Sequence, residues 1–355
     1  MIAQSSKVAN LLLSLASLVI VLLLLEVGIR ALYFQTKSEH SFGVSHLTSW
    51  ARFQLDRKKG IAVNRKAWEA TYLERGLEIP TQGPREGYWA SRTLPNNSDS
   101  PYLRFRSRQI GLEGLVDVDS WGLQHAGVSD TASTHLLLVG GSVAWGAMAS
   151  SIETTYFEKL AELLSQAGHS VRVTVLATGG WVSYDELTAL NAIGLDLGPD
   201  LVIFLNGMND LTEERDPGIE GLDVVTAYLR NMDMARMIST RSGTGCVFVP
   251  QPFLVQKKSP TDVERRIVQM TSLMEVESEY SRLRQGLEEL SDGDPRSHFV
   301  DCSGAADAET ATTFADQWHL SDPGQRLLAE CLARGLEPIL ATRQAYLGQT
   351  VTSPN

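Results

Sequence analysis

The sequence predicts an α/β fold: a three-layer sandwich in which helices cover both faces of a five-stranded parallel sheet. Two observations predict it. From His135 onward, short apolar runs of strand length alternate with longer segments of helical periodicity. Small or polar residues follow these runs at their carboxyl ends, where open α/β sheets place their ligand sites. We therefore expect one sheet with its functional residues along one edge.

The five expected strands are runs of mainly apolar residues. They span residues 136–139, 171–176, 201–205, 246–249 and 298–302. The first lies in the stretch LLLVGGSVAWG, where a glycine pair places Ser142 at the tip of a sharp turn. Such a turn is also common in α/β proteins without a catalytic role, but a dinucleotide site would need glycine where Ser142 stands. A short edge strand is expected near residues 115–118, followed by a turn over residues 119–122.

Helices are expected in the segments that connect or follow these strands. They span residues 154–166, 184–193 and 222–237, a long stretch from about residue 259, and residues 323–345. In the long stretch, Ser259 can cap the helix and Pro260 suits its first turn. The last helix should kink at Pro338.

Residues 8–25 carry no charge and are mostly Leu, Val, Ala and Ile. A helix of about 18 residues, at roughly 1.5 Å per residue, is about 27 Å long, close to the hydrocarbon thickness of a bilayer. The alternative is a cleaved signal peptide, but the run exceeds the usual apolar region and no A-x-A-like site follows it. We therefore expect a single-pass transmembrane anchor in the lipid bilayer. The flanking charges leave its orientation open.

The chain is thus expected to have four parts. Residues 1–35 hold the anchor, and residues 36–133 form a polar juxtamembrane segment with short helices near 50–55 and 66–75. Residues 134–345 form the α/β domain, and residues 346–355 are a tail.

Composition narrows the classes of partner. The net charge of −11 argues against a nucleic-acid partner, because phosphate binding needs a basic surface. The three cysteines, Cys246, Cys302 and Cys331, lack metal-ligand spacing. Cys246 and Cys302 lie in strand-like runs, so we expect two buried free thiols, with a disulfide between them as the alternative.

Four segments on one sheet edge carry the residue types that acyl transfer needs. Ser142 follows the first strand, Gly180 the second, and Asn209 the third, in the stretch GMND. After the fifth strand, the stretch DQWHLS places Asp316 three residues before His319. Taken singly, each of these motifs also has a non-catalytic interpretation, as a turn glycine, a helix cap or a solvated loop. No third ligand at sensible spacing supports a metal site. Their joint occurrence, each after its own strand, favours catalysis.

This order of motifs resembles the SGNH, or GDSL-type, hydrolase superfamily. The first block, usually G-D-S with a glycine four residues later, matches Gly140-Gly141-Ser142 and Gly146, with Gly141 in place of the usual Asp. The second block ends at Gly180, G-x-N-D is present unchanged, and D-x-x-H runs from Asp316 to His319. The asparagine often found at the start of the second block is absent. The resemblance covers about residues 134–340, and the DSWGL stretch at 119–123 is similar to the lead-in of membrane-anchored bacterial members.

The resemblance implies a flavodoxin-like SGNH hydrolase fold and a serine esterase. By this resemblance, Ser142 would attack an ester carbonyl, His319 would take the proton of the Ser142 hydroxyl, and Asp316 would orient the imidazole of His319. The oxyanion would be held by the N–H groups of Ser142 and Gly180 and by the amide of Asn209. The resemblance implies that neither a cofactor nor a metal is needed.

The expected substrate is a short acyl group, preferably acetyl, on a carbohydrate or surface polysaccharide, with the domain on the periplasmic side of a bacterial inner membrane by analogy with anchored members. The alternatives are acyl transfer to a glycan, a lysophospholipase or thioesterase, and a non-catalytic glycan-assembly protein. The helix at 222–237 bears on the choice, because its apolar residues should pack on the sheet as core but could instead form a lid over a long acyl chain. These residues are Leu222, Val225, Leu229, Met232 and Met237.

Overall fold

The structure is a computed structural model that describes residues 123–127, 134–212, 223–269 and 276–351, with the single positions 17, 66, 69, 119 and 132; side chains are described up to residue 343. The chain divides into two units, Met1–Asn64 and Arg65–Asn355, and every element below belongs to the second. In the part of the chain that is described, no helix has the length and apolar character needed to cross a membrane.

Several expectations fall outside the described residues. They are the anchor at 8–25 apart from Ser17, the short helix at 50–55, most of the helix at 66–75, and the edge strand at 115–118. Ser17, Lys66 and Glu69 are each helical.

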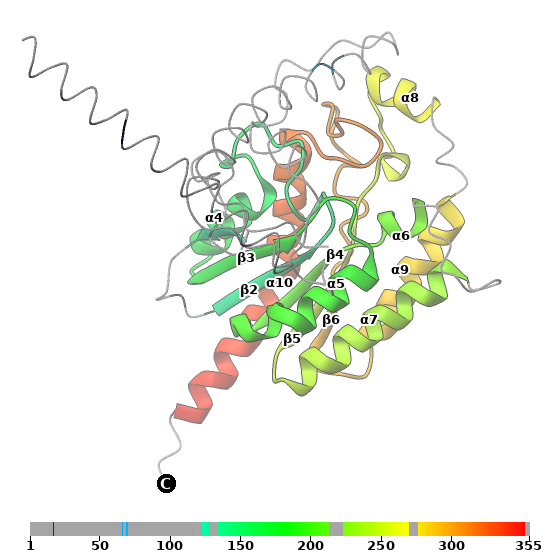
Figure 1. The fold of residues 1–355 in the computed structure, drawn as a ribbon. Helices are drawn as coiled ribbons and strands as arrows, with labels where there is room; N and C mark the ends of the chain where they lie inside the picture. The colour runs from blue at the N-terminus through cyan, green and yellow to red at the C-terminus, as the bar shows by residue number, and fades with distance from the viewer. Residues whose placement is uncertain are drawn as a thin grey trace, which may run out of the picture. The chain divides into compact units, whose positions relative to one another are not determined.

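The core of the described chain is a six-stranded mixed sheet in the order β1-β3-β2-β4-β5-β6 (Figure 1). The five strands expected from the sequence are all present and pair in parallel. They are β2 (Thr134–Gly140), β3 (Val171–Ala177), β4 (Leu201–Asn206), β5 (Gly245–Pro250) and β6 (Ser297–Phe299). Every residue of β2, β4 and β5 is buried, as expected of parallel strands covered on both faces.

The sheet is mixed, not purely parallel, because an edge strand β1 (Gln124–Gly127) pairs antiparallel with β3. It begins after the turn that was expected to end the edge strand. Asp119 contacts the residue before β1: its backbone N–H donates to the Leu123 carbonyl at 2.9 Å, and its Oδ1 accepts from the Leu123 N–H at 3.0 Å. The buried side chain of Gln124 then donates to the Trp145 carbonyl at 3.1 Å, which joins this edge to the turn that holds Ser142.

Helices cover both faces of the sheet, which confirms the three layers. On one face α4 (Tyr156–Gln166) packs against α10 (Asp322–Val351) and against β1 and β3. On the other face α5 (Ser183–Ala189), α7 (Val224–Arg241) and α9 (Glu277–Ser291) lie side by side (Figure 1). A π-helical turn (Leu190–Gly194) continues α5, and short helices α6 (Met208–Thr212) and α8 (Asp262–Gln269) complete this part of the chain.

The helix α7 belongs to the core, as expected. Val225 and Met232 are buried in the main apolar cluster with Phe204 and Phe248 of the sheet, and Leu229 packs against it. Met237 differs, because 37% of it is exposed. Leu222 lies outside the described residues.

The helix after β5 starts within the expected stretch of residues 259–262, but the expected cap at Ser259 was wrong. The helix α8 begins at Asp262, and Thr261 caps it: the Thr261 hydroxyl accepts from the Glu264 N–H at 3.3 Å, and Glu264 Oε2 accepts from the Thr261 N–H at 2.8 Å. This reciprocal pair is a capping box, which satisfies two donors at once. Ser259 and Pro260 precede the helix. At the other end of the domain, α10 contains Pro338 and continues to Val351.

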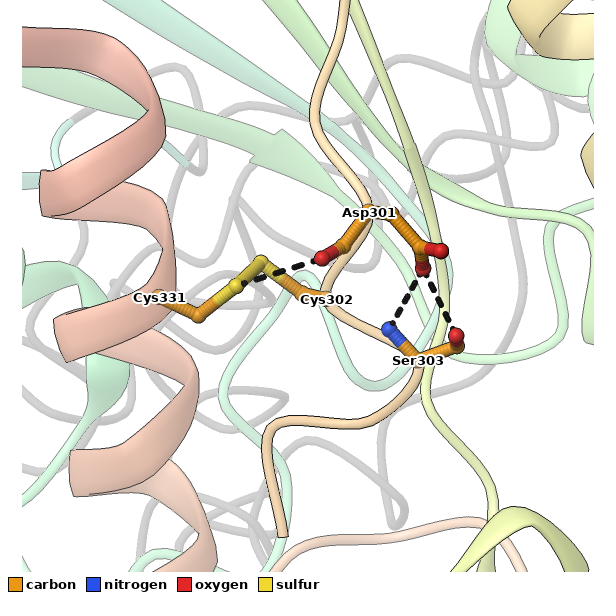
Figure 2. Close-up of a disulfide and its surroundings, with 4 residues drawn as sticks. All are labelled: Asp301, Cys302, Ser303 and Cys331. Atoms are coloured by element: carbon orange, nitrogen blue, oxygen red, sulfur yellow. Dashed lines mark hydrogen bonds between the residues drawn. A yellow bond between two sulfur atoms is a disulfide. The ribbon is translucent and has the colours of Figure 1, made fainter. Parts of the chain in front are cut away.

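The expectation of two buried free thiols is confirmed for Cys246 and wrong for Cys302. Cys302, after β6, forms a disulfide with Cys331 of α10 (Figure 2), and the two Cα atoms are 5.8 Å apart. Cys246 is a buried free thiol. The Cys331 sulfur lies 3.6 Å from the Asp301 carbonyl oxygen, and the Asp301 carboxylate accepts from the Ser303 N–H and hydroxyl. Cys246 lies inside β5 while Cys302 lies beyond the end of β6 beside α10, so only Cys331 reaches Cys302.

Candidate active site

The turn after β2 presents Ser142 at the carboxyl edge of the sheet. The chain folds back at once, with the Trp145 N–H donating to the Gly141 carbonyl and the Ala147 N–H to the Ser142 carbonyl, both at 3.0 Å. Ser142 is half-buried within this turn. Its own N–H donates to none of the residues that the structure describes.

The strand order makes this edge the expected place for a site. Among the parallel strands the order reads second, first, third, fourth, fifth, so the chain leaves β2 toward β3 on one side while β4 lies on the other. This reversal is the switch point at which open α/β sheets bind their ligands. Ser142 follows β2, and Asn209 follows its neighbour β4.

The loop between β6 and α10 brings Asp316 and His319 to Ser142. His319 Nε2 lies 2.8 Å from Ser142 Oγ, and His319 Nδ1 lies 2.7 Å from Asp316 Oδ2. The other carboxylate oxygen of Asp316 accepts from the N–H groups of Trp318 and His319, each at 2.8 Å. The loop closes on itself through a bridge between Phe314 and Leu320. Three side chains from segments 177 residues apart therefore form one hydrogen-bonded chain.

The charge state of Asp316 sets the direction of these hydrogen bonds. Burial alone would raise the pKa of Asp316, but the charge that His319 can carry, together with hydrogen bonds from the His319 ring and the Trp318 and His319 N–H groups, lowers it below its ordinary value. An ionised carboxylate only accepts, so Nδ1 of His319 carries the proton and donates. Nε2 then offers its lone pair to the Ser142 hydroxyl, which is the arrangement that a general base needs.

Asn209 lies against the start of the Ser142 turn. Its amide nitrogen donates to the Trp181 carbonyl at 2.7 Å. A Cβ added to Gly141 would meet the same nitrogen at 2.6 Å and the Trp181 carbonyl oxygen at 3.4 Å. The bare Cα of Gly141 therefore lets the amide approach the residue next to Ser142. The amide's second hydrogen makes no hydrogen bond within the described part of the chain, and it is a donor available to a ligand.

Gly180 lies in the loop after β3, which runs beside the same turn. The Thr178 N–H in this loop donates to the Gly140 carbonyl at 3.2 Å, and the Trp181 N–H returns to the Thr178 carbonyl at 3.2 Å. Gly180 itself has a φ of 82°, in the left-handed region that favours glycine. The loop therefore needs glycine there for a tight turn, whatever its N–H binds.

Asp210 ties together the segments of two expected oxyanion donors. Both carboxylate oxygens accept from the Ser183 N–H, at 3.0 and 3.2 Å, and Oδ1 also accepts from the Ser183 hydroxyl at 2.6 Å. Ser183 begins α5, directly after the loop of Gly180. From the sequence, Asn209-Asp210 was interpreted only as a helix cap or as a source of an oxyanion donor. No local pattern indicated that Asp210 would bind Ser183.

A second group that the sequence analysis missed anchors the Asp316–His319 loop. Glu264 and Lys257 form a fully buried ion pair at 2.8 Å, and Glu264 Oε1 accepts from the Thr313 N–H and hydroxyl and from the Phe314 N–H. Burial alone would raise the pKa of Glu264, but Lys257 and the N–H groups of Thr261 and Thr313 hold it below its ordinary value. The T-x-x-E capping signature at 261–264 was the signal available for this group.

Within the described residues, no group of three or more His, Cys, Asp or Glu side chains is placed to hold a metal ion. Two cavities are also described there, of about 460 and 510 Å³, and their lining residues do not include Ser142, Asp316 or His319.

No curated protein matches this chain. Similar solved structures include an acetylxylan esterase from Geobacillus stearothermophilus, with 21% identity, 58% of this chain and 94% of that chain covered, and a TM-score of 0.42. A putative GDSL-like lipase from Parabacteroides merdae has 17% identity, 57% and 95% coverage and a TM-score of 0.45. A putative acylhydrolase from Bacteroides fragilis has 15% identity, 59% and 90% coverage and a TM-score of 0.42. These structures share the fold with the chain at low identity.

The model of the GDSL-like Lipase/Acylhydrolase family matches residues 138–327, which is more than half of the 355 residues and spans the segments from Ser142 to His319. The chain belongs to the GDSL-like lipase/acylhydrolase family, and it is an ester hydrolase.

Proposed function

We propose that this ester hydrolase is a serine esterase in which Ser142 is the nucleophile, His319 the general base and Asp316 the residue that orients the imidazole. The observation that carries the proposal is the continuous chain from Ser142 Oγ to His319 Nε2 at 2.8 Å and from His319 Nδ1 to Asp316 Oδ2 at 2.7 Å. A nucleophile, a base in contact with it and a group that orients the base are what activation of a hydroxyl requires.

The reaction then runs in two halves. Ser142 Oγ forms a bond to the ester carbonyl carbon while its proton passes to His319 Nε2, and the tetrahedral intermediate expels the alcohol, which takes that proton. A water molecule next loses a proton to Nε2 and attacks the acyl-enzyme. Collapse breaks the bond to Ser142 Oγ, which takes that proton from Nε2, and releases the carboxylic acid. Asp316 stays ionised throughout and stabilises the imidazolium.

The oxyanion of each intermediate is held by the Ser142 N–H, the Gly180 N–H and the Asn209 amide. Support comes from the contact of Asn209 with Gly141 and Trp181, and from the position of the Gly180 loop beside Gly140. Donors fixed before the reaction stabilise the developing charge without reorganisation, which is worth about 3–4 kcal/mol for one donor.

The substrate we propose is a short acyl group, acetyl, on a carbohydrate or surface polysaccharide. Support comes from α7. Its Val225 and Met232 are buried in the core and therefore cannot line a pocket for a long acyl chain. We also propose that residues 8–25 anchor the chain in a bacterial inner membrane with the hydrolase domain in the periplasm, because an anchor holds the site where nascent surface glycans pass.

A series of p-nitrophenyl esters from acetate to octanoate tests the substrate class. An apolar pocket would reward each added methylene by up to about 0.8 kcal/mol, or nearly fourfold in kcat/KM. We expect kcat/KM to fall with chain length. A steady rise from acetate to octanoate would contradict the proposal and favour a lysophospholipase or thioesterase.

A further inference from the structure

The two halves of the proposed site come from opposite ends of the domain. Ser142 follows β2, whereas Asp316 and His319 precede α10, and the Ser142–His319 hydrogen bond spans 177 residues of sequence. The covalent chain does not fix the distance between two segments so far apart in sequence, so contacts between them must do so. A misplacement of about 1 Å between reacting groups can cost roughly 100-fold in rate.

Gln325, in the first turn of α10, lies between the two segments. It is fully buried and lies on the same helix face as the buried Leu328, Leu332 and Leu336. A polar residue at such a position needs partners, since an unpaired buried amide is costly. Its place in an apolar stripe also marks it in the sequence.

All three hydrogen bonds of the Gln325 side chain run to the two halves of the site. Its Nε2 donates to the Ala147 carbonyl at 3.0 Å and to the Leu320 carbonyl at 3.3 Å. Its Oε1 accepts from the N–H of Tyr156, the first residue of α4, at 3.0 Å. Ala147 and Tyr156 belong to the segment that begins with Ser142, and Leu320 is bonded directly to His319.

These bonds complete a continuous path between nucleophile and base. The Ala147 N–H donates to the Ser142 carbonyl at 3.0 Å, so the path runs from Ser142 through Ala147 and Gln325 to Leu320 and His319. One side-chain amide thus fixes the backbone on both sides of the Ser142–His319 contact.

Two further contacts hold α10 in place for this role. Asp322, the first residue of α10, accepts from the Ser150 N–H at 2.9 Å and from its hydroxyl at 2.5 Å. At Gly324 the helix backbone lies against the loop, because a Cβ there would meet the Thr313 carbonyl oxygen at 2.1 Å. The first turn of α10 is therefore in direct contact with both segments.

We propose that Gln325 is a positioning residue that sets the separation of Ser142 and His319. The inference rests on the roles proposed above for these two residues. The three backbone groups around Gln325 need two donors and one acceptor from a single side chain, and a glutamine amide provides all three. A protonated glutamate keeps the acceptor and one donor, and leucine keeps neither.

The variants that test this are Gln325→Leu and Gln325→Glu, and Thr244→Val is the matched control. The Thr244 hydroxyl donates one buried hydrogen bond, to the Pro199 carbonyl at 3.0 Å, just before β5 and at the opposite edge of the sheet from the site. It therefore reports the effect of losing a buried hydrogen bond alone. Each folded protein is assayed for thermal midpoint, for kcat and KM on p-nitrophenyl acetate, and for the rate of Ser142 labelling by a fluorophosphonate.

We expect kcat of Gln325→Leu to fall about 10–100-fold with KM within about threefold, and labelling to slow in parallel. Gln325→Glu should show an intermediate loss, and it serves as the test if the leucine variant does not fold. Thr244→Val should lower the thermal midpoint but keep kcat and labelling within about twofold. Equal kcat and labelling in the Gln325 variants and the control would overturn the proposal.

A measurement that needs no activity separates this proposal from the proposed function. The ring NMR signals of His319 are recorded in the wild-type chain, in Ser142→Ala, and in the Gln325 and Thr244 variants. We expect the Gln325 variants to move these signals toward their position in Ser142→Ala, and the control to leave them in place. If the wild-type chain neither hydrolyses esters nor labels, the proposed function fails, while unmoved His319 signals in the Gln325 variants overturn the positioning role.

Discussion

Gly141 and Asn209 lie so close together that a methyl group on Gly141 would displace the Asn209 side chain. A Cβ on Gly141 would stand 2.6 Å from the Asn209 amide nitrogen, well inside the closest approach of unbonded atoms. The atom that must yield is the far end of a side chain, so the backbone can stay in place. Asn209 would then lose its hydrogen bond to the Trp181 carbonyl.

We therefore expect Gly141→Ala to keep its stability within about 1 kcal/mol, the value of one exchanged hydrogen bond, and to lose kcat by about 10–1000-fold. KM should change little, because the lost donor acts on the oxyanion and not on the bound ester. Steady-state kinetics and a thermal melt of the same variant measure the two effects.

A double-mutant cycle supplies the control. If Gly141→Ala acts by displacing Asn209, it should cost little more once Asn209→Ala has removed that amide. Fully additive losses in kcat would show that the methyl group acts elsewhere, and unchanged kcat in Gly141→Ala would remove Asn209 from the oxyanion site.

For single residues, the sequence pointed to side chains that meet at the candidate site, but not to the groups that hold them in place. Ser142, Asp316 and His319 stand in short motifs with fixed spacing, and the structure brings them into contact. Gln325, Trp181 and Glu264 act through backbone groups that are far away in sequence, and no local pattern encodes such partners. The Gly141–Asn209 contact is of the same kind, although the departure from the usual Asp at 141 marked the position.

Strands and helices were predictable where burial is complete. The runs that form β2, β4 and β5 are apolar throughout because both of their faces are covered. The edge strand β1, with the sequence QHAG and alternate residues exposed, has no such pattern and was not predicted. The cap of α8 was missed because Ser259-Pro260 offered one plausible cap and Thr261-Glu264 offered a better one two residues later.

The disulfide joins two elements around the candidate site. It closes a loop of sequence separation 29 that contains both Asp316 and His319. A closed loop of this length stabilises a fold by about 3–4 kcal/mol in the chain-entropy account. Cysteine pairing depends on which strand ends meet which helix, so the sequence alone left it open.

A buried polar cluster joins α5, β4 and α7. Glu186 of α5 is fully buried and accepts from the Asn206 side chain, whose carbonyl oxygen accepts from the Tyr228 hydroxyl at 2.7 Å. The other Glu186 oxygen has no partner among the described residues. Burial, and then the charges of Asp210 and Asp185, raise the pKa of Glu186 well above its ordinary 4.5, against the Asn206 hydrogen bond.

This cluster predicts a specific dependence of stability on pH. The folded chain keeps the Glu186 proton at pH values where the unfolded chain loses it. The stability that Glu186 contributes is thus fully present below about pH 4.5 and is lost as pH rises toward its pKa in the folded state. Urea melts from pH 4 to pH 8 measure the free energy of unfolding. Relative to the wild type, that of Glu186→Gln should rise by about 1.4 kcal/mol per pH unit between the pKa values of Glu186 in the unfolded and folded chains.

The exposed Glu288 of α9 provides the control. Glu288→Gln should differ from the wild type by a nearly constant amount across the same pH range. A constant difference for Glu186→Gln as well would mean that Glu186 is ionised in the folded chain, contrary to the account.

The whole molecule places its chemistry at one edge because its strands are parallel. Segments after β2, β3, β4 and β6 meet at that edge although they are distant in sequence, and this consequence of topology could be predicted from the order of strands and motifs. The anchor and short helices expected before β1 stay predictions, because nearly all of their residues fall outside the described part of the chain. The acyl chain length and acceptor depend on the shape of a pocket that no motif specifies.

The most direct test of the central claim is the identity of the labelled hydroxyl. The chain is treated with a fluorophosphonate, weighed intact and mapped by peptide mass, alongside Ser142→Ala and the control Ser303→Ala. The account predicts one adduct per chain, on Ser142, in the wild type and in Ser303→Ala, and none in Ser142→Ala, with kcat reduced by about 10⁴–10⁶ in that variant. An adduct and ester hydrolysis that both survive Ser142→Ala would contradict it.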